Sequence, residues 1–193
     1  MDEVDRLIQA FGSRGERNQS LWKLDVLLDL SQRIDPRVVL FLATIATTTG
    51  EPLDVRSEAL SLLRETALSP NDRTVAASAG LVALAPESDD QIRLRAAIVL
   101  GEFVEAEGVL SALGTLAAAD FEPTELRYNA YTSLQRAGPS PACVAILRSL
   151  AEDETFGQSA RALLASWGVT QRSPCLDAFD PRCEDGGLRD SDC

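Results

Sequence analysis

The chain has 193 residues, and its 30 acidic and 18 basic residues give a formal net charge of −12. Binding to nucleic acid needs a surplus of Lys and Arg, so this balance disfavours a nucleic-acid partner. Histidine is absent, which removes both the commonest general base and the commonest metal ligand. We therefore predict that the protein is not an enzyme and holds no metal or cofactor. A catalytic site would have to use carboxylates, Tyr, Cys or Arg.

The sequence contains no apolar run long enough to span a membrane. Its first five residues, Met1 to Asp5, include three acids, whereas a secretory signal begins with basic residues followed by an apolar stretch. We therefore expect a cytoplasmic protein without a membrane partner.

Five sets of apolar or small residues recur along the chain, each spaced i, i+4 and i+8. Their first members are 33, 37, 34 and 30 residues apart. This spacing places each set on one face of a helix, where it predicts a buried stripe. The sets are Trp22/Val26/Leu30, Val55/Ala59/Leu63, Ile92/Ala96/Leu100, Leu126/Ala130/Leu134 and Phe156/Ala160/Leu164.

A further helix is expected before each of these stripes. Three such helices begin at Asp35-Pro36, Ser69-Pro70 and Ser140-Pro141, because Asp or Ser caps a helix and Pro suits its first turn. No segment alternates with period two, so no strand is predicted. The expected helices cover residues 2–12, 18–33, 36–48, 53–67, 70–85, 91–104, 107–119, 124–137, 140–152 and 157–167.

A basic residue follows the first member of four stripes, at Lys23, Arg56, Arg93 and Arg127. We call these four residues the cation ladder and expect them to brace the turns. Acids precede three of them in sequence: Glu51 before Arg56, Asp90 before Arg93, and Asp120 before Arg127. We expect each turn carboxylate to pair with the Arg of the helix that follows it.

These residues carry a family resemblance. The stretch from Ile92 to Glu102 resembles the second helix of a HEAT repeat, and Asp35-Pro36 and Val55-Arg56 are similar features. The resemblance is strongest to bacterial HEAT proteins of the phycobilisome-lyase type and covers residues 1–167. It implies an all-α, right-handed solenoid of about five HEAT-like hairpins, in which the second helices line a concave face.

The composition changes near Gly168, a plausible helix stop. We therefore divide the chain into a solenoid over residues 1–168 and an acidic tail over 169–193. The tail contains Cys175, Cys183 and Cys193, whose spacing matches no zinc pattern. Cys143 lies in an apolar helical run and is expected to be a buried free thiol.

The leading functional hypothesis is a non-catalytic scaffold that binds another protein through its second helices, because a solenoid presents a long ordered surface. An acidic chain suggests a basic or neutral partner and association that weakens in salt. The alternatives are a chromophore-lyase-like role, implied by the resemblance, and a DNA-binding HEAT protein, disfavoured by the charge. The expected partner-binding residues are Ser57, Ser61, Arg64, Arg95, Tyr128, Gln135 and Gln158.

Overall fold

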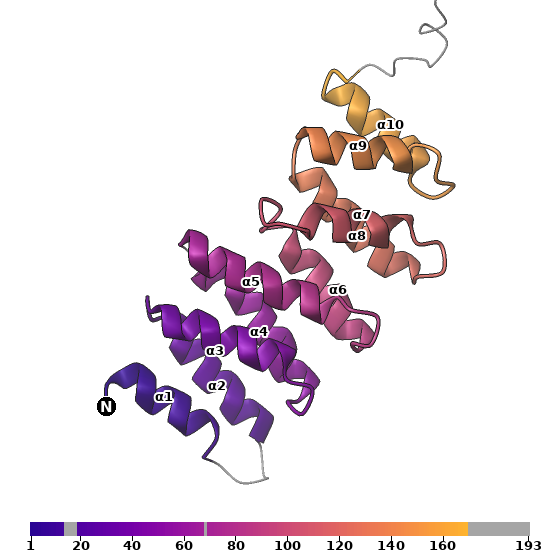
Figure 1. Cartoon of the computed structure of the whole chain (residues 1–193). Coiled ribbons are helices and arrows are strands. Elements are labelled where there is room, and N and C mark those ends of the chain that lie inside the picture. The colour runs from indigo at the N-terminus through magenta and orange to yellow at the C-terminus, as the bar shows by residue number, and fades with distance from the viewer. Residues whose placement is uncertain (14–18, 68, 170–193) are drawn as a thin grey trace, which may run out of the picture.

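The computed structural model describes residues 1–13, 19–67 and 69–169, which form ten α-helices and no strand (Figure 1). The helices are α1 (Glu3–Phe11), α2 (Gln19–Ser31), α3 (Pro36–Thr47), α4 (Leu53–Thr66), α5 (Pro70–Ala83), α6 (Asp90–Leu100), α7 (Val109–Ala118), α8 (Thr124–Arg136), α9 (Pro141–Leu150) and α10 (Gly157–Ser166).

Consecutive helices pair into five hairpins, which stack along one axis (Figure 1). The second helices α2, α4, α6 and α8 pack on one another in a row, and the first helices α3, α5, α7 and α9 form a parallel row on the other side. The predicted all-α solenoid of about five hairpins is confirmed.

Side-chain caps fix the starts of three first helices. Asp35 accepts the Arg37 backbone N–H at 2.9 Å, and Ser69 accepts that of Asp72 at 3.1 Å. Ser140 accepts the Cys143 N–H at 3.2 Å. Each cap satisfies an N–H that the helix leaves unpaired, so these helices begin where the sequence predicts.

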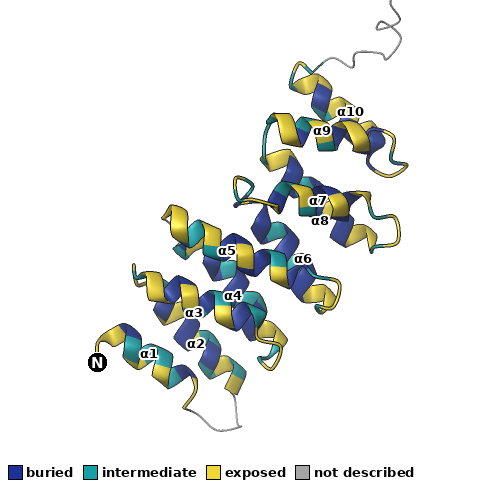
Figure 2. Cartoon of the chain, in the orientation of Figure 1, coloured by how far each residue is buried: buried dark blue, intermediate teal, exposed yellow. Residues whose placement is uncertain are grey.

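The five apolar stripes form the core between the two rows. Every member is buried except the half-buried Trp22, whose Nε1–H donates to the Ala10 carbonyl at 3.1 Å. The buried residues run continuously through the stack from α2 to α10 (Figure 2). Each hairpin therefore shares its core with the next one.

The turn after α6 departs from the predicted helix over 91–104. The helix ends at Leu100, and the Gly101 N–H donates to the Ile98 carbonyl in a tighter turn. Phe103 in this turn is fully buried, with the Arg73 guanidinium 5.0 Å from its ring centre. Because Phe103 is apolar and buried, it continues the apolar pattern of α6 in the sequence, although the helix itself ends at Leu100.

The last helix ends at Ser166, two residues before the glycine predicted to stop it. Gly168 has φ +71°, and the Val169 N–H donates back to the Leu164 carbonyl at 3.0 Å, a pattern typical of glycine C-caps. The three tail cysteines lie outside the described residues, so the predicted tail stays a prediction. No helix of the described chain is long and apolar enough to cross a membrane.

Candidate protein-binding surface

The cation ladder lies inside the stack, and its four members are between 5% and 7% exposed. Three of them donate to the last turn of the preceding first helix. The Nε of Arg56 bonds the Ala46 carbonyl at 3.2 Å, that of Arg93 bonds Leu84 at 3.3 Å, and that of Arg127 bonds Ala117 at 2.9 Å. These bonds satisfy carbonyls that a helix end leaves unpaired.

The carboxylate partners come from the following repeat. Lys23 pairs with Glu51 at 2.6 Å, Arg93 with Glu122 at 2.5 Å, and Arg127 with Asp153 at 2.6 Å. We expected each acid to pair with the Arg that follows it in sequence, and this differs from the structure. The expected Asp90–Arg93 contact is present only as a 3.7 Å approach by a side chain that is 74% exposed.

The predicted partner-binding residues lie on the second helices, in two groups. Arg95 of α6 donates from Nε to the Ser57 hydroxyl of α4 at 3.2 Å, and Ser61 turns its hydroxyl to the Ser57 carbonyl. Arg64 of α4 and Arg136 of α8 both approach one Glu102 oxygen at 3.7 Å. Each of these two arginines stands in the last turn of its helix, where a cation is favoured.

The remaining predicted residues are exposed at the later second helices. Tyr128 is 59% exposed, and Gln135 and Gln158 are also exposed. Tyr131 is buried and stacks on Phe156 at 4.9 Å between ring centres. The structure therefore separates the two tyrosines, placing one in solvent and one in the core.

Two buried groups are poor candidates for chemistry. Burial raises the pKa of the Cys143 thiol, which donates to the Leu134 carbonyl at 3.3 Å. Burial also raises the pKa of Tyr131, and the nearby Gln135 side chain offsets part of that rise. The Tyr131 hydroxyl has no hydrogen-bond partner of good geometry. Among the described residues, no group of three or more Cys, Asp or Glu side chains is arranged to hold a metal ion.

The opposite side of the molecule is almost free of charge. Past their first turns, α3, α5, α7 and α9 carry a single charged residue, Arg148. We call the exposed side of these four helices the outer surface. Its exposed residues include Leu40, Thr44, Thr74, Ser78, Val82, Ser111, Thr115, Ala118, Ala142, Ala145, Ser149 and the charged Arg148. In a chain with 30 acidic and 18 basic residues and a net charge of −12, this low density of charge past the first turns marks a distinct face.

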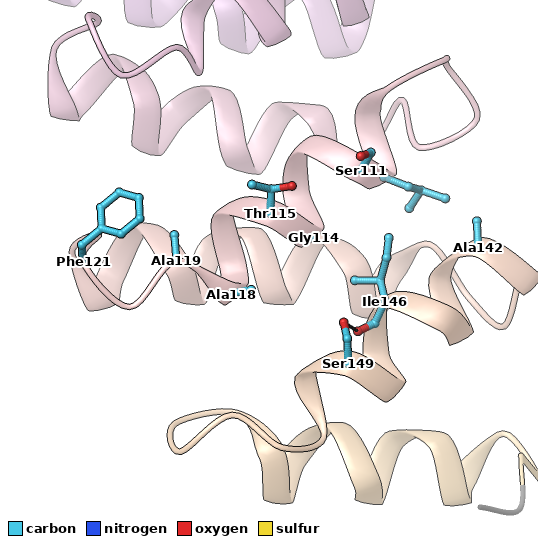
Figure 3. A pocket seen from close by; sticks show the side chains of 10 residues that line it. Ser111, Gly114, Thr115, Ala118, Ala119, Phe121, Ala142, Ile146 and Ser149 are labelled. Carbon is cyan, nitrogen blue, oxygen red and sulfur yellow. Dashed lines mark hydrogen bonds between the residues drawn. The ribbon is translucent and has the colours of Figure 1, made fainter. Parts of the chain in front are cut away.

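Hollows lie between the helices of the outer surface. The largest of three such hollows, of about 650 Å³, lies between α7 and α9; small polar residues such as Ser111 and Thr115 and apolar residues such as Ala118 and Ile146 line it (Figure 3). A second hollow of about 360 Å³ lies between α5 and α7, and a third of about 370 Å³ between α3 and α5. The outer surface is therefore grooved along its length.

Phe121 stands at the end of the two hollows that flank α7. It belongs to the turn after α7, lines both hollows, and is 84% exposed (Figure 3). Burying a phenylalanine is worth about 1.5–3 kcal/mol, so an exposed ring beside apolar hollows is a candidate contact for a partner.

The sequence-based selection of residues missed this surface. It assigned binding to the second helices, whose exposed residues are mostly polar and charged but include Leu21, Leu28 and Leu53. The signal available in the sequence was the lack of charge in the first helices, most marked in α7, which has no charged residue at all. That signal also fits a buried helix, so only the exposure of its residues distinguishes the two interpretations.

Comparison with known proteins gives a structural match. The chain is similar to human deoxyhypusine hydroxylase in a structure determined in complex with glycerol, at 20% sequence identity and a TM-score of 0.55. The match covers 86% of this chain and 62% of that one, so this chain spans less than two thirds of that enzyme's length. No family model matches the chain. No curated protein matches it either. The likeness shows the fold, a HEAT-like α-solenoid.

This comparison corrects the prediction that the chain is not an enzyme. A protein of the same fold is a hydroxylase, so the prediction is wrong: neither a helical-repeat fold nor a short list of catalytic side chains excludes catalysis. The prediction rested on absent histidine, although carboxylate, Tyr, Cys and Arg side chains remain in the chain.

Proposed function

We propose that this chain binds another protein through the outer surface over α7 and α9, with Phe121 as the anchor. The observation that carries the proposal is a phenylalanine, 84% exposed, that lines both the uncharged hollow between α7 and α9 and the hollow between α5 and α7. Few contacts dominate most interfaces, and exposed aromatic side chains beside pockets are favoured among them.

The shape and chemistry of the largest hollow suggest the kind of partner. Two helices flank it, and its described lining contains no charged side chain. A partner helix with an apolar face would fit between α7 and α9, a recognised mode of peptide binding. Because charge is absent from this groove, binding here should change little with salt. This differs from the salt-sensitive association expected from the overall charge.

The second helices are the competing surface, as the sequence predicts. Tyr128 is exposed there, and Arg64 and Arg136 share the carboxylate of Glu102. A partner on this side would need polar and charged contacts, so its binding should weaken as salt rises. The two surfaces therefore differ in a measurable way.

The test is affinity capture from cells of the source organism with wild-type chain, Phe121→Ser and the matched control Tyr128→Ser. Each variant removes one exposed aromatic ring from a different side. If the outer surface binds, Phe121→Ser weakens the captured partner's affinity about 30-fold, the effect of truncating an interface anchor, and Tyr128→Ser leaves it unchanged. The reverse pattern would assign binding to the second helices. Retention of every partner by both variants would exclude both surfaces.

A further inference from the structure

The cation ladder has one member without a counter-charge. Lys23, Arg93 and Arg127 each pair with a carboxylate from the following repeat, at 2.5–2.6 Å. Arg56 occupies the same position in α4 and is 5% exposed, yet no carboxylate in the described chain lies within ion-pair distance of it. Among the described residues its side chain makes one hydrogen bond, from Nε to the Ala46 carbonyl, and neither Nη group has a partner there.

Two of the three paired acids stand at the same position before a second helix, and α6 has no acid at that position. Glu51 stands two residues before the start of α4, and Glu122 two residues before the start of α8. Ser88 holds the equivalent position before α6. The neighbouring acids do not replace it: neither Asp89, whose side chain accepts the Gln91 N–H at 2.9 Å, nor the exposed Glu87 lies within ion-pair distance of Arg56.

The surroundings of Arg56 favour binding of an anion at its guanidinium. A buried guanidinium without a counter-charge is strongly disfavoured, and a carboxylate that reaches it regains two charge-assisted hydrogen bonds. Arg93 shows the geometry that the position supports, because its two Nη groups contact the two Glu122 oxygens at 2.9 and 2.5 Å. The Arg56 side chain is not sealed, since the Tyr131 hydroxyl is the only fully enclosed side-chain polar atom without a partner in the described chain.

We propose that Arg56 binds one carboxylate group supplied from outside its repeat, at the position that Glu122 occupies beside Arg93. The ligand class is a compound or side chain bearing a single accessible carboxylate, which would meet Arg56 beside the turn that contains Ser88. The proposal does not depend on the function proposed for the outer surface.

The test measures the thermal midpoint of the full chain in sodium acetate against sodium chloride at equal ionic strength. Acetate is expected to raise the wild-type midpoint by about 2–4 °C, because it binds the folded state only. Ser88→Glu places a carboxylate where the register provides one, so it should raise the midpoint without acetate and abolish the acetate effect. Ser88→Gln is the matched control and should keep the acetate effect.

A capped Gly-Asp-Gly peptide in place of acetate distinguishes the source of the carboxylate. Stabilisation by both probes indicates a protein side chain as ligand, and stabilisation by acetate alone indicates a small carboxylate. Two results would overturn the proposal: a wild-type midpoint that does not respond to acetate, or an acetate effect that persists in Ser88→Glu.

Discussion

Arg93 is contacted by two carboxylates that differ sharply in burial. Glu122 is 11% exposed and 2.5 Å from the guanidinium, whereas Asp90 is 74% exposed and 3.7 Å away. The hydrogen bond from Arg93 holds the pKa of Glu122 below its usual value. Exposed pairs contribute little to stability, and buried pairs are costly to break. Glu122 therefore provides most of the stabilisation of the buried Arg93 guanidinium, and Asp90 provides little.

Glu122→Gln is expected to lower the free energy of unfolding by about 3 kcal/mol, because it leaves the buried Arg93 beside a neutral amide. Asp90→Asn is the matched control and should change that free energy by less than about 0.5 kcal/mol. Urea unfolding of both variants measures the difference. Equal losses in the two would contradict the assignment of the stabilising partner.

The contribution of the Arg93–Glu122 pair to stability should depend on pH. Because the folded-state pKa of Glu122 lies below its ordinary value of 4.5, the unfolded chain binds the proton more readily. The stabilisation is therefore complete above pH 4.5 and is lost as pH falls through the lowered folded-state value. The stability gap between wild type and Glu122→Gln should narrow over that acidic range, and a gap that widens there would contradict the pairing.

At the scale of the helices, α7 and α9 approach each other closely at Gly114. A Cβ added at Gly114 would lie 2.8 Å from Ile146 Cγ2, closer than side-chain atoms pack. Glycine inside a helix costs about 1 kcal/mol relative to alanine, so its presence in α7 is explained by this close contact. The contact also shapes the largest hollow, because both residues line it (Figure 3).

Gly114→Ala is expected to destabilise the chain by about 1–2 kcal/mol, because overpacking against the branched Ile146 outweighs the better helix propensity of alanine. In Ile146→Ala the space is free, so adding Gly114→Ala to that variant should stabilise it. A double-mutant cycle by urea unfolding measures this change of sign. If Gly114→Ala stabilises the wild-type background, the contact between α7 and α9 is looser than the structure indicates.

At the scale of the whole molecule, each hairpin contacts only its neighbours in sequence. The interior helix α4 packs on α2, α3, α5 and α6, whereas α1 packs on α2 and α3, and α10 mainly on α9. In such stacks stability is a sum of repeat and neighbour terms. The ends of the chain should therefore open more readily than its middle.

Hydrogen exchange by mass spectrometry is expected to show the slowest amides in α4 and α6 and the fastest helical amides in α1 and α10. The reason is that terminal helices lose fewer contacts when they open locally. Uniform protection across the ten helices would indicate that the solenoid unfolds as one unit and would contradict this expectation.

Local signals made most of the fold predictable. Caps such as Ser69 with Pro70 act within a few residues, so the expected helix bounds agree with the structure to within four residues, the largest error being at α6. Partners in other repeats were not predictable: Arg93 meets Glu122 29 residues away. The hollows were missed for the same reason, because they depend on the spacing between helices and not on either helix alone.

The backward pairing of acids has a consequence for how such a chain can lengthen or shorten over time. Arg93 belongs to one repeat and its carboxylate, Glu122, to the next, so this ion pair forms only when the two repeats are neighbours. Duplicating or excising a repeat would place a buried cation beside the turn of a different repeat. An excision that joins the hairpin of α4 directly to that of α7 and α8 would bring Glu122 to Arg56. Repeats of this chain therefore share a shape but are not interchangeable in charge. At the junction before α6, the stacking is kept but Ser88 stands where an acid would pair with the buried Arg56.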